Sequence, residues 1–170
     1  LLKKMVKFII TGPESSGKTT LAKKLSETYN ICLVEEYARK YLNENENKYG
    51  FNDLLKIAHK QYENEKNCKQ FCICDTDLIT IKIWSNYKYS KCDSWIEEKI
   101  FKQSHEKRIY LLCKPDIKWE YDPQRENKKN RNEIFDIYEK EITKLNYPFF
   151  IIDGEKRLSK AQKIIKKFFK

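Results

Sequence analysis

A glycine-containing segment near the N-terminus constrains the fold of this chain more than any other feature. Residues 12–19 read GPESSGKT and fit the phosphate-binding pattern G-x-x-x-x-G-K-[ST] at every fixed position. The short apolar run at residues 6–10 predicts a buried strand before it. Leu21, Ala22 and Leu25 recur after it at helical spacing. A strand, a glycine loop and a helix in this order predict an α/β fold built around a phosphate-binding loop.

The loop has the chemistry of a triphosphate cradle. Its glycines let the backbone bend so that N–H groups converge on phosphate oxygens. The helix that follows adds unpaired N–H groups and a partial positive charge. Lys18 is predicted to reach the β- and γ-phosphates, and the Thr19 hydroxyl is predicted to ligate Mg²⁺. We therefore expect ATP and Mg²⁺ as cofactors, with ATP held by Gly12, Pro13, Glu14, Ser15, Ser16, Gly17, Lys18, Thr19 and Thr20.

Length and composition predict one globular domain. The chain has 170 residues, of which 40% are hydrophobic and 35% are charged. Apolar runs stay well below the roughly 18 residues of a membrane span. The apolar stretch at the N-terminus runs directly into the phosphate loop, which favours a core strand over a secretory signal. We expect a single kinase-like domain over residues 1–170, a cytoplasmic location and no membrane partner.

Six cysteines raise the question of a metal site or disulfides. The chain holds no C-x-x-C pair and has two histidines. Cys72 and Cys74 alternate within a predicted strand. Free cysteines packed as small apolar residues are therefore the favoured interpretation. The six are Cys32, Cys68, Cys72, Cys74, Cys92 and Cys113.

The formal net charge is +10, with lysines scattered along most of the chain. Residues 156–170 are an exception, because they form a basic helix with an apolar stripe that includes Leu158, Ala161 and Ile165. Such a helix can lie on a membrane surface. The favoured interpretation is the last helix of the domain, with its basic face in solvent.

Apolar strands alternate with helical segments along the chain, which is typical of a parallel sheet covered by helices. The predicted fold class is therefore α/β, a three-layer phosphate-loop NTPase fold with a five-stranded parallel sheet. The predicted strands are residues 6–10, 31–34, 71–74, 108–113 and 149–152. Apolar residues at helical spacing fall within residues 19–29, 51–62, 78–84, 95–100 and 134–145.

One long polar segment, at about residues 114–132, interrupts this alternation. It contains Pro115 and Pro123 and is dense in basic residues. Long connections in compact domains are often lids. Arg125 and Arg131 are predicted to close over the transferring phosphoryl group and stabilise its charge. A solvated basic loop is the alternative.

Polar residues follow three of the predicted strands, where ligands bind in this fold class. Asp75 is predicted to organise Mg²⁺, and Asp75 or Thr76 can instead, or in addition, open the next helix. Glu36 can bind or deprotonate a substrate hydroxyl and Arg39 can clamp phosphate, unless they mark an ordinary helix start. Gly154 and Arg157 are predicted to approach the base of ATP, although Asp-Gly is also common in plain turns.

Short motifs spread along nearly the whole chain match one family pattern in order. They are residues 10–20, 36–39, 59–62, 75–77, 115–119, 122–125, Arg131 and residues 148–154. The phosphate loop with Pro-Glu-Ser-Ser and the Asp-Thr-Asp at 75–77 are the more specific of these. With them the chain resembles the ribosylnicotinamide kinases, which occur alone or fused to a nicotinamide-mononucleotide adenylyltransferase in bacterial NAD salvage.

The resemblance implies a nucleoside-monophosphate-kinase-like fold and a small-molecule nucleoside partner. It implies ATP-dependent phosphorylation of the 5′-hydroxyl of nicotinamide riboside to give nicotinamide mononucleotide. It also implies that Asp75 serves Mg²⁺ and the nucleophile, and that Arg125 and Arg131 are lid arginines, so that the catalytic set is Lys18, Asp75, Arg125 and Arg131. The residues implied to line the riboside pocket are Glu36, Tyr37, Arg39, Gln61, Tyr62 and Asp77.

Three features depart from the family pattern. Pro123 stands where the family usually has a glycine after the lid aspartate. Glu35 stands where an aromatic residue often precedes Glu36, and its acid can still attract the positive charge of a pyridinium ring. No adenylyltransferase domain precedes the kinase segment, so we expect either a stand-alone kinase or an excised domain.

Two other functions stay open at this point. The chain could phosphorylate another small nucleoside, nucleotide or metabolite, because the phosphate loop recognises only the common donor. A nucleotide-dependent regulatory or nucleic-acid-binding ATPase would account for the charge and the basic final helix. The basic residues form no aromatic-interleaved pattern, so we do not expect a nucleic-acid partner. The preference for ATP or GTP and the oligomeric state stay open as well.

Overall fold

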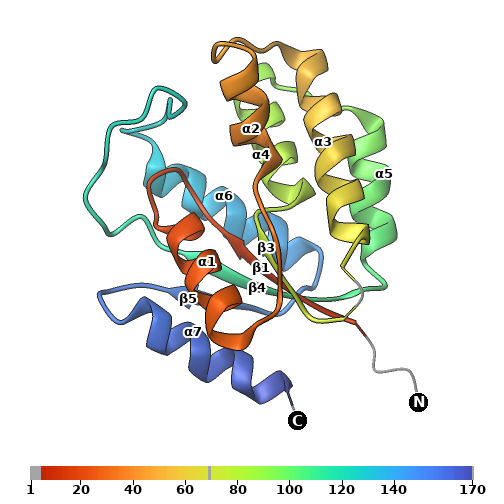
Figure 1. Ribbon diagram of the computed structural model, residues 1–170. Helices are drawn as coiled ribbons and strands as arrows, with labels where there is room; N and C mark the ends of the chain where they lie inside the picture. The colour runs from red at the N-terminus through yellow and green to blue at the C-terminus, as the bar shows by residue number, and fades with distance from the viewer. Residues whose placement is uncertain (1–4, 69, 170) are drawn as a thin grey trace.

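A parallel sheet with helices on both faces forms the protein in a computed structural model that describes residues 5–68 and 70–169 (Figure 1). Within those ranges the sheet has five strands in the order β2-β3-β1-β4-β5, and every neighbouring pair is parallel. The predicted three-layer α/β fold is confirmed. The strands are β1 (Val6–Thr11), β2 (Cys32–Val34), β3 (Cys72–Asp75), β4 (Lys107–Cys113) and β5 (Phe149–Ile152).

Helices cover both faces of the sheet, so the central strands β1, β3 and β4 are buried from both sides. Helices α1 and α7 pack on one face, and α2 to α6 pack on the other. No helix in the described part of the chain is long and apolar enough to cross a membrane. The helices are α1 (Lys18–Tyr29), α2 (Tyr37–Glu44), α3 (Phe51–Lys66), α4 (Leu78–Tyr89), α5 (Ser94–Gln103), α6 (Arg131–Lys144), α7 (Arg157–Ile165) and the 3₁₀ turn η1 (Lys166–Phe168).

The side chains of β1 alternate between the two cores. Phe8 and Ile10 belong to the core beneath α1 and α7, whereas Ile9 belongs to the core beneath α2 to α6. Helix α7 buries Ala161 and Ile165 in the first of these cores. The basic final helix is therefore the last helix of the domain, as favoured, because its apolar stripe is already covered by the sheet.

The cysteine prediction is wrong for one pair. Cys32 at the start of β2 and Cys68 just after α3 form a disulfide, with their Cα atoms 6.4 Å apart. The fold brings together two residues that are 36 positions apart in sequence. The other four cysteines are free, and Cys72, Cys74 and Cys113 among them are buried as small apolar residues.

Gly12 ends β1 where the chain turns into the phosphate loop, and a larger residue would not fit there. Its φ of +135° lies in the region that favours glycine. A Cβ atom at this position would lie 2.5 Å from the carbonyl oxygen of Cys113 on β4. The close approach of the loop to β4 therefore depends on the missing side chain.

We expect Gly12→Ala to lower the free energy of unfolding by about 2 kcal/mol or more, because backbone strain and a steric clash act together. Gly154→Ala is the matched control, because Gly154 has a φ of +68° but open space around its Cβ position. The control should lose about 1 kcal/mol from strain alone. Denaturant unfolding of both variants measures this difference, and equal losses would contradict the role of the clash.

Candidate active site

A cavity of about 420 Å³ lies at the carboxyl ends of the strands, between the phosphate loop, the helices α2, α4 and α6, and the connection from β4 to α6. It brings together most of the residues predicted to bind ATP and several from the later segments. Predicted site residues that line it are Gly12, Pro13, Glu14, Ser15, Ser16, Gly17, Lys18, Thr19, Thr20, Glu36, Arg39 and Arg125.

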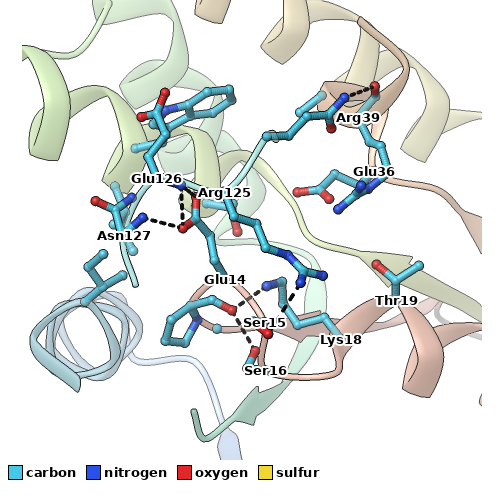
Figure 2. Close-up of a pocket in the computed structure, with 18 of the residues that line it drawn as sticks. Glu14, Ser15, Ser16, Lys18, Thr19, Glu36, Arg39, Arg125, Glu126 and Asn127 are labelled. Carbon is cyan, nitrogen blue, oxygen red and sulfur yellow. Dashed lines mark hydrogen bonds between the residues drawn. The ribbon is translucent and has the colours of Figure 1, made fainter. Parts of the chain in front are cut away.

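The phosphate loop is held in shape by its own side chains (Figure 2). Ser16 Oγ donates a hydrogen bond to the carbonyl oxygen of Pro13 at 2.7 Å, and Lys18 Nζ donates to the same oxygen at 2.6 Å. Gly17 is the N-cap of α1 with a φ of +80°. Because α1 begins at Lys18, its unpaired N–H groups and its partial positive charge are presented to the cavity.

Two carboxylates, Glu36 and Asp75, lie close to Lys18. Glu36 lines the cavity described above, whereas Asp75 lines a second cavity that shares Thr19, Glu36 and Arg39 with it. Burial, followed by the charge of Asp75, raises the pKa of Glu36 to about 7. Burial also raises the pKa of Asp75, against the opposing effects of the Thr19 hydroxyl and Lys18. Glu36 is the N-cap residue of α2, yet its side chain makes no cap hydrogen bond. Glu36 is therefore both the residue that opens α2 and a residue of the predicted site.

The residues around Asp75 fit a magnesium ion. Asp75 Oδ1 is buried and has no hydrogen-bond partner, while the Thr19 hydroxyl bonds to the same side chain. Mg²⁺ commonly takes one or two protein oxygens and completes its shell with water and substrate phosphates. No cluster of three or more His, Cys, Asp or Glu suited to a metal occurs in the described ranges, and none is required for such a site.

Residues 114–130, the connection from β4 to α6, make up most of the predicted lid segment and contact the phosphate loop. The Glu14 carboxylate accepts hydrogen bonds from the backbone N–H groups of Glu126 at 3.0 Å and Asn127 at 2.7 Å. Arg125 Nη1 bonds to the carbonyl of Glu120 at 2.7 Å and lies 3.4 Å from Ser15 Oγ. Figure 2 shows Arg125 between the Glu36 side and the Glu126 side of the site.

Three other predicted arginines hold the walls of the site together. Arg131, the first residue of α6, donates to the carbonyl of Ser15 at 3.0 Å, and Arg157 donates to the carbonyl of Ser16 at 2.9 Å. Arg39 Nη1 donates to the carboxylate of Asp122 in the lid at 2.8 Å. The predicted phosphate-facing arginines thus bind backbone and lid groups around the loop.

Gly154 lies in the turn after β5, close to these contacts. Its N–H donates to the carboxylate of Asp116 at 2.8 Å, and its carbonyl accepts from Arg157 Nε at 3.0 Å. The turn therefore braces the start of the lid. Neither Gly154 nor Arg157 lines the cavity.

Four residues implied by the family resemblance to line the riboside pocket lie outside the cavity. The backbone N–H of Tyr37 donates to Gln61 Oε1 at 2.9 Å, so that Gln61 joins α3 to the start of α2. Tyr62 packs against Trp95 on α5, with ring centroids 5.6 Å apart. The fourth, Asp77, is fully buried.

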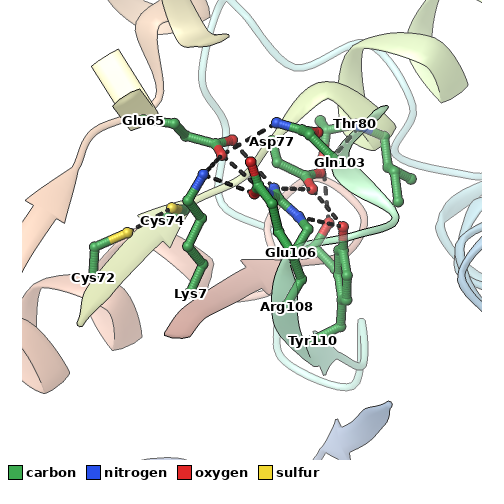
Figure 3. A network of polar contacts seen from close by, with 12 residues as sticks. Lys7, Glu65, Cys72, Cys74, Asp77, Thr80, Gln103, Glu106, Arg108 and Tyr110 are labelled. Carbon is green, nitrogen blue, oxygen red and sulfur yellow. Dashed lines mark hydrogen bonds and ion pairs between the residues drawn. The ribbon is translucent and has the colours of Figure 1, made fainter. Parts of the chain in front are cut away.

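Asp77 belongs to a buried network of charges beneath α3, α4 and α5 (Figure 3). Its carboxylate accepts from Arg108 at 2.8 Å and from the Tyr110 hydroxyl at 2.6 Å, and it caps α4 through the N–H of Ile79. Arg108 also pairs with Glu65 at 2.9 Å. The carboxylate therefore fixes the start of α4 to the sheet.

Helix α4 supplies a wall of the cavity, although the sequence predicts residues 78–84 only as a helix with an apolar stripe. Trp84 lies in that stripe, and one face of the same helix also carries Lys88 four residues later. A helix face that carries basic as well as aromatic side chains differs from a purely apolar core stripe. This mixture is the sequence signal by which the cavity wall on α4 could have been predicted. The residues concerned are Thr80, Ile83, Trp84, Tyr87 and Lys88 on α4, together with Ile134 and Tyr138 on α6.

A family model described as an AAA domain (AAA_28) matches residues 7–157. The chain belongs to this family. The match covers the phosphate loop and all five strands apart from Val6. The segments on which the sequence resemblance rests, within residues 10–154, also lie inside it.

Proteins with known names extend the comparison. The trifunctional NAD biosynthesis/regulator protein NadR of Salmonella typhimurium is 34% identical over 79 residues, which is 42% of this chain and 19% of that protein. NadR crystallised with NAD and AMP-PNP has a TM-score of 0.75 at 21% identity, over 96% of this chain and 49% of its own. NadR with NR has a TM-score of 0.72 at 18% identity, over 96% of this chain and 51% of its own. The chain thus spans about half the length of the solved NadR chains. Together with the family match, these similarities confirm the resemblance that the sequence motifs indicate.

Asp77→Ala should lower the free energy of unfolding by about 3 kcal/mol, because it leaves Arg108 buried with one counter-charge fewer. Denaturant unfolding measures the loss, and Asp136→Ala on the exposed side of α6 is the matched control. A variant with wild-type stability but weakened acceptor binding would restore the pocket role implied by the family resemblance.

Proposed function

We propose that this chain is an ATP-dependent ribosylnicotinamide kinase. In this reaction the γ-phosphoryl group of ATP is transferred to the 5′-hydroxyl of nicotinamide riboside. The observation that carries the proposal is the pair Glu36 and Asp75 beside Lys18, of which Glu36 lines a cavity that continues from the phosphate loop to an aromatic wall. The named relatives support it, because NadR has been solved with AMP-PNP and with NR, the abbreviation of nicotinamide riboside.

The donor half of the site would hold the triphosphate. Lys18 and the N–H groups at the start of α1 would neutralise the β- and γ-phosphates. Thr19 and Asp75 would hold Mg²⁺, which supplies positive charge against the phosphate oxygens. Arg125 in the lid would turn from the Glu120 carbonyl towards the γ-phosphate, where charge spreads during transfer.

Glu36 is the best placed proton acceptor. A base whose pKa lies near the working pH combines a deprotonated population with useful basicity, and the pKa of Glu36 is raised to about 7. As the 5′-oxygen of the acceptor bonds to the γ-phosphorus, its proton passes to the Glu36 carboxylate. The bond from the γ-phosphorus to the bridging oxygen breaks, and ADP leaves. Asp75 keeps its role at the metal.

The acceptor half would suit a flat, positively charged base. Trp84, Tyr87 and Tyr138 supply aromatic surface, and aromatic faces attract cations. The carboxylates of Glu36 and Glu126 line the same cavity and add negative charge. Nicotinamide riboside carries a cationic pyridinium ring, whereas ordinary nucleosides carry neutral bases. This difference supports the proposed acceptor over other nucleosides.

We also propose that residues 1–170 act as one kinase domain with residues 114–132 as its lid. A role in NAD salvage supports a cytoplasmic location, because the nucleotides of that pathway are made inside the cell. ATP as donor, Mg²⁺ as metal and a nucleoside as the small-molecule partner follow from the same proposal.

Lys18→Ala and Asp75→Asn should each lower kcat at least about a hundredfold, because the first removes a positive charge beside the phosphates and the second weakens the hold on Mg²⁺. ADP release with nicotinamide riboside and a panel of other nucleosides measures the effect. Lys24→Ala is the matched control, because Lys24 is an exposed lysine on the same helix. Near-normal rates in both site variants would remove the assigned chemistry, and activity with another nucleoside alone would replace the acceptor.

The pH profile tests Glu36. The raised pKa means that the carboxylate is mostly protonated below pH 7 and mostly ionised above it. If Glu36 accepts the proton, kcat should rise about tenfold per pH unit below the pKa and level off above it. Glu36→Gln should be slow and lack this rise. A rise with an unchanged midpoint in Glu36→Gln would assign the titration to another group.

A further inference from the structure

The hydroxyl of Tyr49, in the connection between α2 and α3, joins the cavity wall to the lid. It accepts a hydrogen bond from Trp84 Nε1 at 2.9 Å and one from Lys88 Nζ at 2.6 Å. It donates to the carboxylate of Glu126, with oxygens 3.0 Å and 3.1 Å away. A phenol has one donor and two acceptor positions, so all of its hydrogen-bonding capacity is used here.

The aromatic and cationic groups around Tyr49 pack as well as hydrogen-bond. The rings of Tyr49 and Trp84 meet edge to face, with centroids 4.7 Å apart. Lys88 Nζ lies 4.1 Å from the centroid of the Tyr49 ring and 2.9 Å from a Glu126 oxygen. An exposed ion pair alone contributes little, whereas charges that share partners in a network contribute more.

Glu126 is bound from two sides. Its side chain is held by Tyr49 and Lys88, and its backbone N–H is held by the carboxylate of Glu14 in the phosphate loop. The lid therefore has one residue that is anchored to both halves of the site. Arg125 precedes it directly, so the register of the Arg125 side chain over Ser15 depends on where Glu126 is held.

We propose that Tyr49 and Lys88 are positioning residues that act through Glu126 to place Arg125 over the phosphate loop. The proposal rests on the phosphotransfer proposed above, in which Arg125 stabilises the transferring group. Trp84 and Lys88 also line the cavity, so an acceptor in the site contacts the same side chains that hold the lid. The position of Arg125 therefore depends on side chains of α4 that the acceptor would also contact.

Lys88→Met and Tyr49→Phe test the anchor, because each removes a polar group and keeps most of the side-chain volume. Lys82→Met is the matched control, since Lys82 lies on the same helix and pairs at 2.8 Å with Glu141 on α6. Hydrogen exchange of the whole protein is followed by mass spectrometry over the lid amides. Exchange at residues 118–130 should be at least about fivefold faster in both anchor variants and unchanged in the control, and equal lid exchange in Lys88→Met and Lys82→Met would overturn the proposal.

A double-mutant cycle with Arg125 separates positioning from a general loss of structure. Lys88→Met alone should lower kcat about fivefold, the scale of a surface pair worth about 1 kcal/mol. In an Arg125→Ala background it should lower kcat less than twofold, because the group that it positions is gone. Lys88→Arg should restore most of the rate. Independent effects that multiply would overturn the proposal.

The two readouts keep this proposal apart from the function. Hydrogen exchange needs no acceptor, so faster lid exchange in the anchor variants would support the anchor even if the wild-type protein phosphorylated no nucleoside. That second result would overturn the proposed kinase activity alone. A fully active wild type with unchanged lid exchange in both anchor variants would overturn the anchor alone.

Discussion

The buried guanidinium of Arg108 is the interaction on which the geometry of the site depends most. It pairs with Glu65 near the end of α3 and with Asp77 at the start of α4, and both carboxylates are fully buried. Lys7 on β1 pairs with Glu65 as well. Buried charges are stable only while each keeps its partners. Helix α4 is therefore fixed to the sheet by charges that never face the cavity, and its other side chains form the wall of the cavity.

A second electrostatic arrangement lies beside Lys18, with the opposite consequence. Burial raises the pKa of both Glu36 and Asp75, and the charge of Asp75 raises the pKa of Glu36 further. In the network around Arg108, paired charges fix the start of α4. Beside Lys18, Asp75 Oδ1 has no hydrogen-bond partner, so in the proposed function it is available to a metal ion.

The elements that depend on local sequence could be predicted, and those that depend on distant partners could not. The phosphate loop was predicted in place because its shape is set by Pro13, Ser16 and Gly17 within a single turn. The local sequence around Asp77 does not show that Arg108, 31 residues later, pairs with its carboxylate in the core. The Cys32–Cys68 disulfide likewise joins two segments of the chain that no local pattern connects. The cavity wall on α4 was not predicted, since helical spacing alone does not show that residues 114–130 leave a cavity above the helix.

The connection from β4 to α6 rests on groups that belong to the phosphate loop, namely the carboxylate of Glu14 and the hydroxyl of Ser15. Arg131 at the start of α6 holds the Ser15 carbonyl as well. In the proposed kinase reaction, a nucleotide would displace these contacts on entry, and the product nucleotide would do so again on departure. The measured turnover would then report the rate at which this connection opens as well as the rate of chemistry.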